Sequence, residues 1–430
     1  MDMKVVKQNL SKKFIELENE LRGKYSTSFF HIYTTGDYNK DDISLLTKKD
    51  VGTFIHEYVH FWQNIGTLWG LGYSILFYNE IRSFVDEIKN KDEIKLPVNI
   101  CLNKYRDERH KYEIGNGTNC DSLYLGKIVD TQKRIQINWD CEGTIPIVNL
   151  HIPFTDGSNI PITLGAHIIK ESMAVLYQEI FDSSTTHNDI PYNVVKLICR
   201  NHYPQFCNNP RFLICVCYAS LFSITPGYTL INLLAHATKE HVDDGIQLVA
   251  DYLTTGKVVT SKHNKPISII ECFDEMIDCF LQNLRENLMA PLDYIEEVLN
   301  RMKLSNKWFL PPLLTVLNEP DKKLYDNLNE ILRFMSIPYI QASNGIFYAS
   351  TTKKPLDEQT EKDASLDVLE LNAQEALFLF LTGKTSCCPL YYMCQGGKFE
   401  KEECFNLPWN GSECVMTYVG HFLREKNIHW

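Results

Sequence analysis

The chain has 430 residues, of which 44% are hydrophobic and 23% are charged, and its formal net charge is −11. This balance is typical of a globular protein long enough to bury more than one core, and it excludes a disordered or fibrous chain. An acidic surface repels phosphate backbones, and no dense run of lysine and arginine offsets it. We therefore expect no nucleic-acid partner.

The sequence also bears on the compartment. The first residues contain no apolar segment followed by a small-residue cleavage site, so we expect no secretory signal. The most apolar stretch, residues 212–237, is interrupted by Thr225-Pro226-Gly227, which predicts two buried helices and no membrane span. Fourteen cysteines in such a chain are expected to be thiols or metal ligands in a reducing compartment. The predicted location is the cytoplasm.

The N-terminal part of the chain shows three successive patterns. Apolar residues recur at helical spacing over residues 4–24, which predicts an amphipathic helix. The aromatic run over residues 28–33 predicts a short strand. Residues 42–89 have a helical pattern with one or more breaks around residues 66–72.

Strand-like and helical patterns then alternate along the rest of the chain. Short β-prone runs between turn residues predict a β-rich insertion over about residues 94–162. A helical pattern returns at residue 163 and, from about residue 190, continues to about residue 340 with prolines at its boundaries. Residues 351–367 are polar and predict an exposed linker, and a helix over about residues 366–381 leads into a cysteine-rich end.

The helix expected after residue 42 contains the motif His56-Glu57-Tyr58-Val59-His60. Residues four apart lie on one face of a helix, so both imidazoles are directed toward one point and could chelate one Zn²⁺. Glu57 lies about 100° around the helix axis, where it could act on a metal-bound water without being a ligand. Zinc lowers the pKa of that water, and the carboxylate takes its proton as it attacks a carbonyl.

A catalytic zinc needs a third protein ligand and one open position. Three later residues are candidates: Glu171, inside the helix expected from residue 163; His167, one turn earlier on the same face; and His151, in the preceding β-prone segment. No histidine follows the motif at the spacing HExxHxxGxxH, which excludes the metzincin subclass.

The motif and the later helix that carries Glu171 resemble the gluzincin type of metallopeptidase. The resemblance covers about residues 53–67 and 163–178. The resemblance implies that His56 and His60 are zinc ligands, Glu57 is the general base and Glu171 is the third ligand. The thermolysin-like pattern also places an aspartate four residues after the ligand glutamate, where this chain has Val175. A different partner must then orient the ligand imidazole, or Glu171 is not the ligand. We expect His167 near the site without ligation.

The resemblance also frames the expected fold. We predict an α+β fold that is predominantly helical, with a zincin-like catalytic region over residues 1–185 that contains the β-rich insertion. A helical region over residues 186–345 and a C-terminal region over residues 346–430 would follow. A histidine or tyrosine usually stabilises the oxyanion in such enzymes. The sequence does not choose among its candidates in the helical region, Tyr218, Tyr228, His236 and His241.

Five cysteines lie close together near the C-terminus: Cys387, Cys388, Cys394, Cys404 and Cys414. Four of them could hold a structural zinc, but the spacing is not the usual pair of CxxC knuckles. Buried free thiols are the alternative, and a redox-sensitive cluster is a third.

These features predict a zinc-dependent metallopeptidase that hydrolyses peptide bonds of an intracellular protein. The motif and the predicted location resemble those of standalone effectors, toxins and phage-exclusion (antiviral defence) peptidases. A protease free in the cytoplasm must be selective or held inactive, so we expect a regulatory protein partner or a trigger. Two alternatives stay open: a zinc hydrolase of a non-peptide amide, and a catalytically silent zinc-binding interaction protein.

Overall fold

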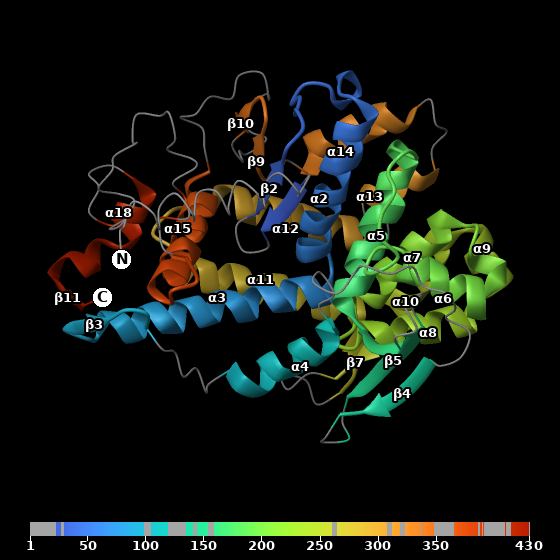
Figure 1. Ribbon diagram of the computed structural model, residues 1–430, viewed down its shortest axis with the longest axis horizontal. Helices are drawn as coiled ribbons and strands as arrows, with labels where there is room; N and C mark the ends of the chain where they lie inside the picture. The colour runs from blue at the N-terminus through green and yellow to red at the C-terminus, as the bar shows by residue number, and fades with distance from the viewer. Residues whose placement is uncertain are drawn as a thin grey trace.

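The computed structural model describes residues 23–26, 30–98, 105–118, 135–140, 143, 145–153, 159–259, 265–307, 312–318, 323–335, 337–347, 365–385, 388, 390, 409 and 414–429. Within these residues the chain is mostly helical and carries four small β-sheets. The predicted fold class, α+β with helices predominating, is therefore confirmed. Figure 1 shows the helices of residues 194–255 gathered on one side of the molecule and the C-terminal elements on the other.

Two consecutive helices, α2 (Lys48–Gly66) and α3 (Leu68–Lys89), run through the middle of the molecule (Figure 1). The predicted break between them falls at Thr67, whose extended backbone belongs to neither helix. The Thr67 hydroxyl donates to the carbonyl of Gln63 at 2.7 Å and accepts from the amide of Gly70 at 3.1 Å. One side chain therefore caps the end of α2 and the start of α3.

Helix α2 is buried along almost its whole length. It begins where the Thr47 hydroxyl accepts a hydrogen bond from the amide of Asp50, a strong N-cap. From Val51 to Ile65 nearly every side chain is buried, including the polar residues of the motif. A helix that is buried all round belongs to a core, so its polar side chains must find partners inside the protein.

Helix α5 (Ala166–Phe181) packs along α2 in the opposite direction. Gly52 of α2 lies against the end of α5, where an added Cβ would be 2.9 Å from the Cβ of Asp182 and 3.3 Å from the Cγ of Gln178. At the other end of the contact, Gln63 of α2 donates to the backbone carbonyl of Lys170. The absence of a side chain at Gly52 thus allows the two helices to approach closely.

A four-stranded sheet lies next to α2, in the order β1 (Gly23–Ser26), β2 (His31–Thr34), β9 (Tyr339–Ala342) and β10 (Gly345–Phe347). Strand β2 confirms the second half of the strand predicted over residues 28–33, and the first two residues of that prediction lie outside the described residues. Strand β1 pairs antiparallel with β2 and forms an edge of the sheet. The predicted N-terminal helix also lies outside the described residues, except for its last two, which belong to β1 instead.

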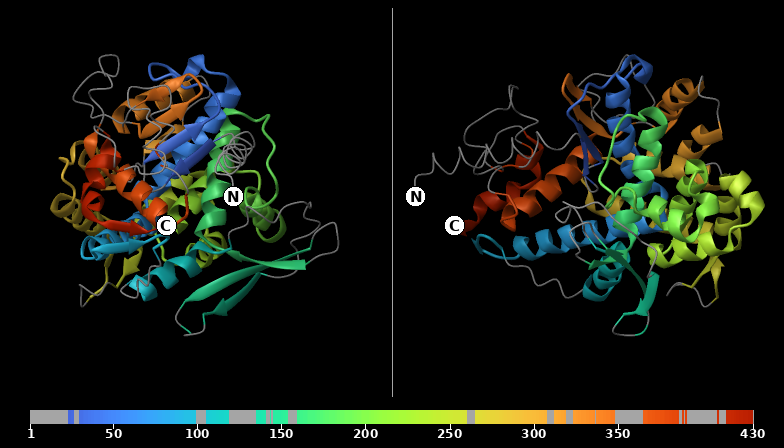
Figure 2. Two further views of the ribbon diagram at one scale, coloured as in Figure 1. Left: turned by 60° about the vertical axis from the view of Figure 1, so that its left-hand side comes forward. Right: turned by 45° about the vertical axis from the view of Figure 1, so that its right-hand side comes forward.

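The predicted β-rich insertion is only partly a β structure. Strands β4 (Ile135–Trp139), β5 (Pro146–Pro153) and β6 (Asn159–Leu164) form an antiparallel sheet that projects from the helical body (Figure 2). Helix α4 (Arg106–Asn116) precedes them, so the segment also contains a helix that the sequence pattern did not predict. Its strongly charged sequence lacks an apolar stripe, and only Gly115 is fully buried.

The helical pattern from about residue 190 to 340 is confirmed. It consists of the helices α6 (Val194–His202), α7 (Pro210–Ser220), α8 (Pro226–His236), α9 (Lys239–Asp243), α10 (Gly245–Thr255), α11 (Ile269–Asn287), α12 (Asp293–Lys307), α13 (Pro312–Thr315) and α14 (Leu324–Met335), with the short pair β7 (Lys257–Val258) and β8 (Ile267–Ser268). The apolar stretch 212–237 divides into α7 and α8, as predicted. Among the described helices, none has the length and apolar character needed to cross a bilayer.

The C-terminal elements have a hydrophobic cluster of their own. Helix α15 (Leu366–Leu381), which matches its prediction, and helix α18 (Val415–Val419) pack on the far half of α3. Strand β11 (Asn427–His429) pairs parallel with β3 (Glu93–Lys95), just after the end of α3. The rest of the described core forms one larger cluster around α2 and α5.

Two buried carboxylates of α15 tie it to the start of α12. Asp367 accepts from the backbone amides of Tyr294 and Ile295, at 3.0 and 2.9 Å. Glu370 accepts from the amides of Met289 and Ala290 just before that helix. Hydrogen bonds from amides to a charged acceptor contribute roughly 1.5–3 kcal/mol each, so these carboxylates fix the position of α15.

A third carboxylate of α15, Glu375, predicts a dependence of stability on pH. Burial raises the pKa of Glu375 to about 8, although Lys24 and Lys384 counteract the shift. A folded-state pKa above the unfolded one favours the folded protein at low pH, and this advantage is lost as the pH rises through about 8. Glu375→Gln removes the ionisation and keeps the shape of the side chain. Between pH 4.5, the ordinary pKa of glutamate, and about pH 8, the free energy of unfolding of the variant should therefore rise relative to that of the wild type. The increase should be up to about 1.4 kcal/mol per pH unit.

Thermal unfolding of both proteins at pH 5, 7 and 8.5, followed by circular dichroism, measures this difference. Glu87→Gln, a change at an exposed position of α3, serves as the control. A difference in Tm between Glu375→Gln and the wild type that stays constant over the three pH values would contradict the expected linkage.

Candidate metal centre

Three side chains predicted from the sequence converge where α2 and α5 touch. His56 and His60 lie one turn apart on α2, with ring centroids 5.0 Å from each other. Glu171 reaches them from α5: its Oε2 is 3.3 Å from Nε2 of His56, and its Oε1 is 3.4 Å from Nε2 of His60. The three potential ligand atoms all lie within 4.8 Å of one another. The antiparallel packing of two buried helices therefore assembles the group.

This group could bind a metal ion. Two imidazole nitrogens and one carboxylate oxygen form a donor set suited to a divalent transition metal, and three protein ligands leave a coordination position open. The carboxylate faces one imidazole with each of its oxygens, so its orientation is fixed from both sides. Within the described part of the chain, no other group of histidine, cysteine, aspartate and glutamate side chains is close enough for this role.

The electrostatics of the group favour an ionised Glu171. Burial acts to raise the pKa of Glu171, but attraction to His60 and hydrogen bonds from His56 and His60 outweigh it and hold the pKa well below its usual range. Ligating carboxylates must be deprotonated, so no proton has to be removed from Glu171 when an ion enters.

Two glutamine amides hold the outer nitrogens of the imidazoles. Nδ1 of His56 is 3.1 Å from Oε1 of Gln178, and Nδ1 of His60 is 2.9 Å from Oε1 of Gln63. An amide oxygen only accepts, so each Nδ1 carries a proton, and each Nε2, which faces Glu171 as a donor here, is the atom on which a metal would replace a proton. Gln178 is thus the side chain that contacts the outer nitrogen of His56. It lies seven residues after Glu171, whereas Val175 is buried in the core.

Glu57 lies beside the potential ligands, under strand β1. Only 6% of its surface is exposed. A Cβ added at Gly23 would be 2.7 Å from Oε1 of Glu57, and the backbone amide of Tyr25 donates a hydrogen bond to the carboxylate. Burial raises the pKa of Glu57 to about 7, against the attraction of His56 and with the repulsion of Glu171. A carboxylate with a pKa near neutrality is suited to general acid–base chemistry.

Two further rings border the site from the loop after α5, and no clear pattern in the sequence predicted them. The His187 ring stacks on His56 with centroids 6.0 Å apart, and Tyr192 meets the edge of His56 at 6.2 Å. His187 and Tyr192 also contact each other at 4.9 Å. The one available signal was their position a few residues beyond the helix that carries Glu171.

The other candidate ligands have different positions. His167 lies on α5 one turn before Glu171 and does not belong to the group of potential ligands. His151 lies on β5 and is 3.3 Å from the amide oxygen of Gln136 on the neighbouring strand. The structure therefore brings together His56, His60 and Glu171 and places His151 in a sheet contact.

The structure gives the surroundings of each of the four candidate oxyanion donors. Tyr218 is fully buried, stacks on Trp62 and donates to the carbonyl of Gly66, so it supports the back of α2. Tyr228 is partly buried against the core, and the exposed His236 bonds the carbonyl of Asn232 in its own helix.

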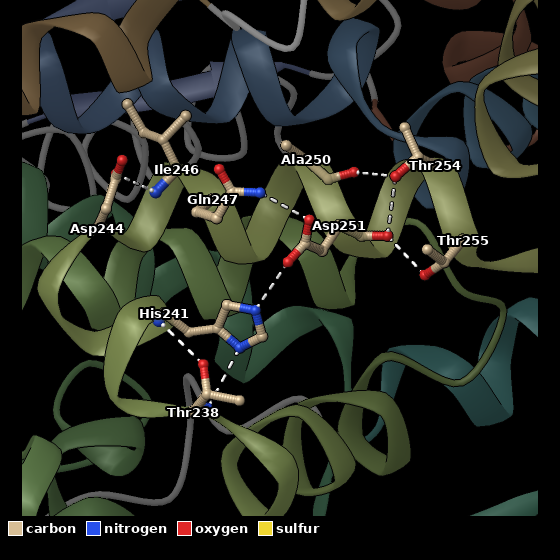
Figure 3. A network of polar contacts seen from close by, with 9 residues as sticks. All are labelled: Thr238, His241, Asp244, Ile246, Gln247, Ala250, Asp251, Thr254 and Thr255. Carbon is tan, nitrogen blue, oxygen red and sulfur yellow. Dashed lines mark hydrogen bonds and ion pairs between the residues drawn. The ribbon is translucent and has the colours of Figure 1, made fainter.

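His241 belongs to a polar network that joins α9 to α10 (Figure 3). Its Nε2 is 2.9 Å from Oδ2 of Asp251, and its Nδ1 accepts from the backbone amide of Thr238. Asp251 also accepts from Gln247, at 2.7 Å. Both nitrogens of the ring are therefore engaged in a helix cap and an inter-helix contact.

The predicted cysteine cluster lies mostly outside the described residues, which exclude Cys387, Cys394 and Cys404. Cys388 is buried and Cys414 is partly buried, and both pack in the C-terminal hydrophobic cluster. A structural zinc at this position stays a prediction.

Comparisons of the chain with protein-family models, with curated proteins and with solved structures found no match.

The hydrogen bonds of the imidazoles to Gln63 and Gln178 lead to a prediction about metal affinity. Gln63→Met keeps the length of the side chain but removes the acceptor for His60, so the ring loses its fixed tautomer and orientation. Loss of such a partner typically weakens metal binding by roughly 10–100-fold. Competition with a chromophoric chelator for Zn²⁺ measures the change. Gln247→Met, the same substitution in the α10 network, is the control, and equal affinities in the two variants would contradict the assignment.

Proposed function

We propose that the protein is a zinc-dependent metallopeptidase that cleaves peptide bonds in a protein substrate. One observation supports this above the others: two imidazoles and a carboxylate form a potential metal site, and a second, buried carboxylate lies directly beside it on the same helix. A purely structural metal site would have no use for Glu57. Its burial beside Glu171 raises the free energy of its charged form.

In this proposal His56, His60 and Glu171 hold the ion and Glu57 handles the proton. Zn²⁺, when bound, lowers the pKa of a water ligand toward neutrality and polarises a carbonyl. Glu57 accepts the proton of the attacking water and returns it to the nitrogen of the departing amine, so the carboxylate ends the cycle as it began. The amide of Tyr25 orients the Glu57 carboxylate for both transfers.

Strand β1 favours a peptide substrate over a small amide. It is an edge strand of its sheet, and the backbone beside Tyr25 faces Glu57. Extended peptides bind to sheet edges through main-chain hydrogen bonds, which would hold a scissile bond close to the base. A small amide would make no use of such an edge. A protein substrate and a regulatory partner stay predictions. The same holds for the assignment to toxin-like or phage-defence effectors.

The proposal predicts the behaviour of Glu57→Gln. The variant keeps the metal ligands and the shape of the side chain but cannot accept a proton, so peptide hydrolysis should fall by roughly 10²–10⁴-fold. Elemental analysis should show the metal content of the wild type, whereas His56→Ala should lose the metal and the activity together. Cleavage is assayed by mass spectrometry of new termini in a protein mixture. Unchanged cleavage by Glu57→Gln would refute the proposed base.

The pH profile is a separate prediction. Glu57 must be ionised to accept a proton, and its pKa is raised to about 7 in the metal-free protein. A cation in the site would lower that pKa by attraction. Activity should therefore decline as the pH falls, with a midpoint at or below about 7. Metal content is measured at each pH, because protonation of the imidazoles also releases metal. An acid limb centred well above pH 7 at full metal content would exclude Glu57 as its source.

A further inference from the structure

The loop between α5 and α6, residues 182–193, carries a histidine that contacts the metal site through an intermediate side chain. Oε1 of Gln178 is 3.1 Å from Nδ1 of His56 and 2.9 Å from Nε2 of His187. A single amide oxygen is therefore shared between a metal-ligand imidazole and an imidazole of the loop. The two rings also stack at 6.0 Å, with their planes 23° apart.

The directions of these hydrogen bonds follow from the chemistry of the groups. A metal takes the unprotonated Nε2 of His56, so Nδ1 must carry the proton and needs an acceptor. This requirement turns the oxygen of the Gln178 amide toward His56. His187 faces the same oxygen, so its Nε2 must donate. The tautomer of His187 and the orientation of the amide are thus coupled to the metal-binding form of His56.

The loop is held against α5 close to the metal ligands. The hydroxyl of Ser172, the residue after Glu171, donates to the carbonyl of Pro191 at 3.1 Å. The side chain of Asn193 donates to the carbonyl of His187 at 3.4 Å. At the start of the loop, Asp182 accepts from the amide of Ser184. His187 is therefore fixed between anchors on both sides of the loop.

We propose that His187 is a positioning residue for the metal ligand His56, acting through Gln178. Its N–H fixes the amide of Gln178, which in turn fixes the tautomer and the ring orientation of His56. Docking of the loop and binding of the metal then stabilise each other, because linkage between two equilibria is reciprocal. The proposal rests on the metal centre of the proposed function but not on peptide hydrolysis.

Two matched substitutions test the hydrogen bond separately from the ring. His187→Phe keeps a stacking ring and removes the donor, whereas His187→Gln removes the ring and supplies an N–H at similar reach. We expect His187→Phe to bind Zn²⁺ roughly 10–100-fold more weakly and His187→Gln to stay within about threefold of the wild type. The visible spectrum of the Co²⁺-loaded protein should change in His187→Phe and be restored in His187→Gln. Equal losses in both variants, or none in either, would overturn the proposal.

A double-mutant cycle tests the route through Gln178. In a Gln178→Leu background, His187→Phe should weaken Zn²⁺ binding no further, because the shared acceptor is already gone. A full additional loss would show that His187 acts by another route. Zn²⁺ affinity is the readout throughout, so a failure of the proposed peptidase activity in Glu57→Gln would leave this result unaffected.

Limited proteolysis of the wild-type protein gives an answer even if a variant fails to fold. Cleavage by proteinase K within residues 183–189 should slow when Zn²⁺ is added, whereas cleavage near residues 236–239, which are mostly exposed and take no part in the metal site, should not. Equal cleavage of residues 183–189 with and without Zn²⁺ would overturn the coupling between the loop and the metal site.

Discussion

The candidate site depends on one packing contact, the close antiparallel approach of α2 and α5. Neither helix has a complete set of metal ligands, since two imidazoles lie on one helix and the carboxylate on the other. The approach is possible because Gly52 leaves room for Gln178 and Asp182. A methyl group at that position would displace the end of α5 that orients His56. Distances between ligands matter to tenths of an ångström, so backbone packing determines the geometry of the metal site.

Burial gives the two carboxylates of the site opposite properties. Glu171 faces two imidazoles, which stabilise its charge and lower its pKa. Glu57 has fewer stabilising partners and lies near Glu171, and its pKa rises to about 7. One of the two neighbouring carboxylates is thus held ionised, and the other has a pKa near neutral pH. Such a division is typical of sites that combine ligation with acid–base chemistry.

The sequence predicted the elements whose pattern is strong and local. Helices α2, α3 and α15 were evident from their helical patterns, and the division of residues 212–237 was evident from Thr225-Pro226-Gly227. Helix α4 was missed because its residues are mostly charged and its packing comes from a few side chains such as Tyr112, which lies against Trp69. His56 and His60 could be predicted because metal chemistry restricts residue type and spacing, whereas Glu171 was one of three candidates and was chosen through the gluzincin resemblance.

The outer partners could not be predicted, because they depend on the direction of packing. In an antiparallel pair, the earlier of the two histidines on α2 lies toward the end of α5, so His56 contacts Gln178 and not the side chain four residues after Glu171. His60 instead uses Gln63 from its own helix. His187 lies in a loop that is held in place by hydrogen bonds of Ser172, Asp182 and Asn193. No periodic pattern in the sequence predicts the path of that loop.

The outer partners of both imidazoles are glutamines, and this affects how tightly the site would bind an ion. A carboxylate in that position makes an imidazole more electron-rich and tightens its hold on a cation, whereas a neutral amide leaves the ring less basic. With one anionic ligand, a bound dication keeps a net charge of about +1 at the site, which strengthens its pull on electrons from an incoming carbonyl. The same excess charge makes departure of the ion easier. We therefore expect an exchangeable metal whose occupancy follows the free concentration of the ion in the surroundings.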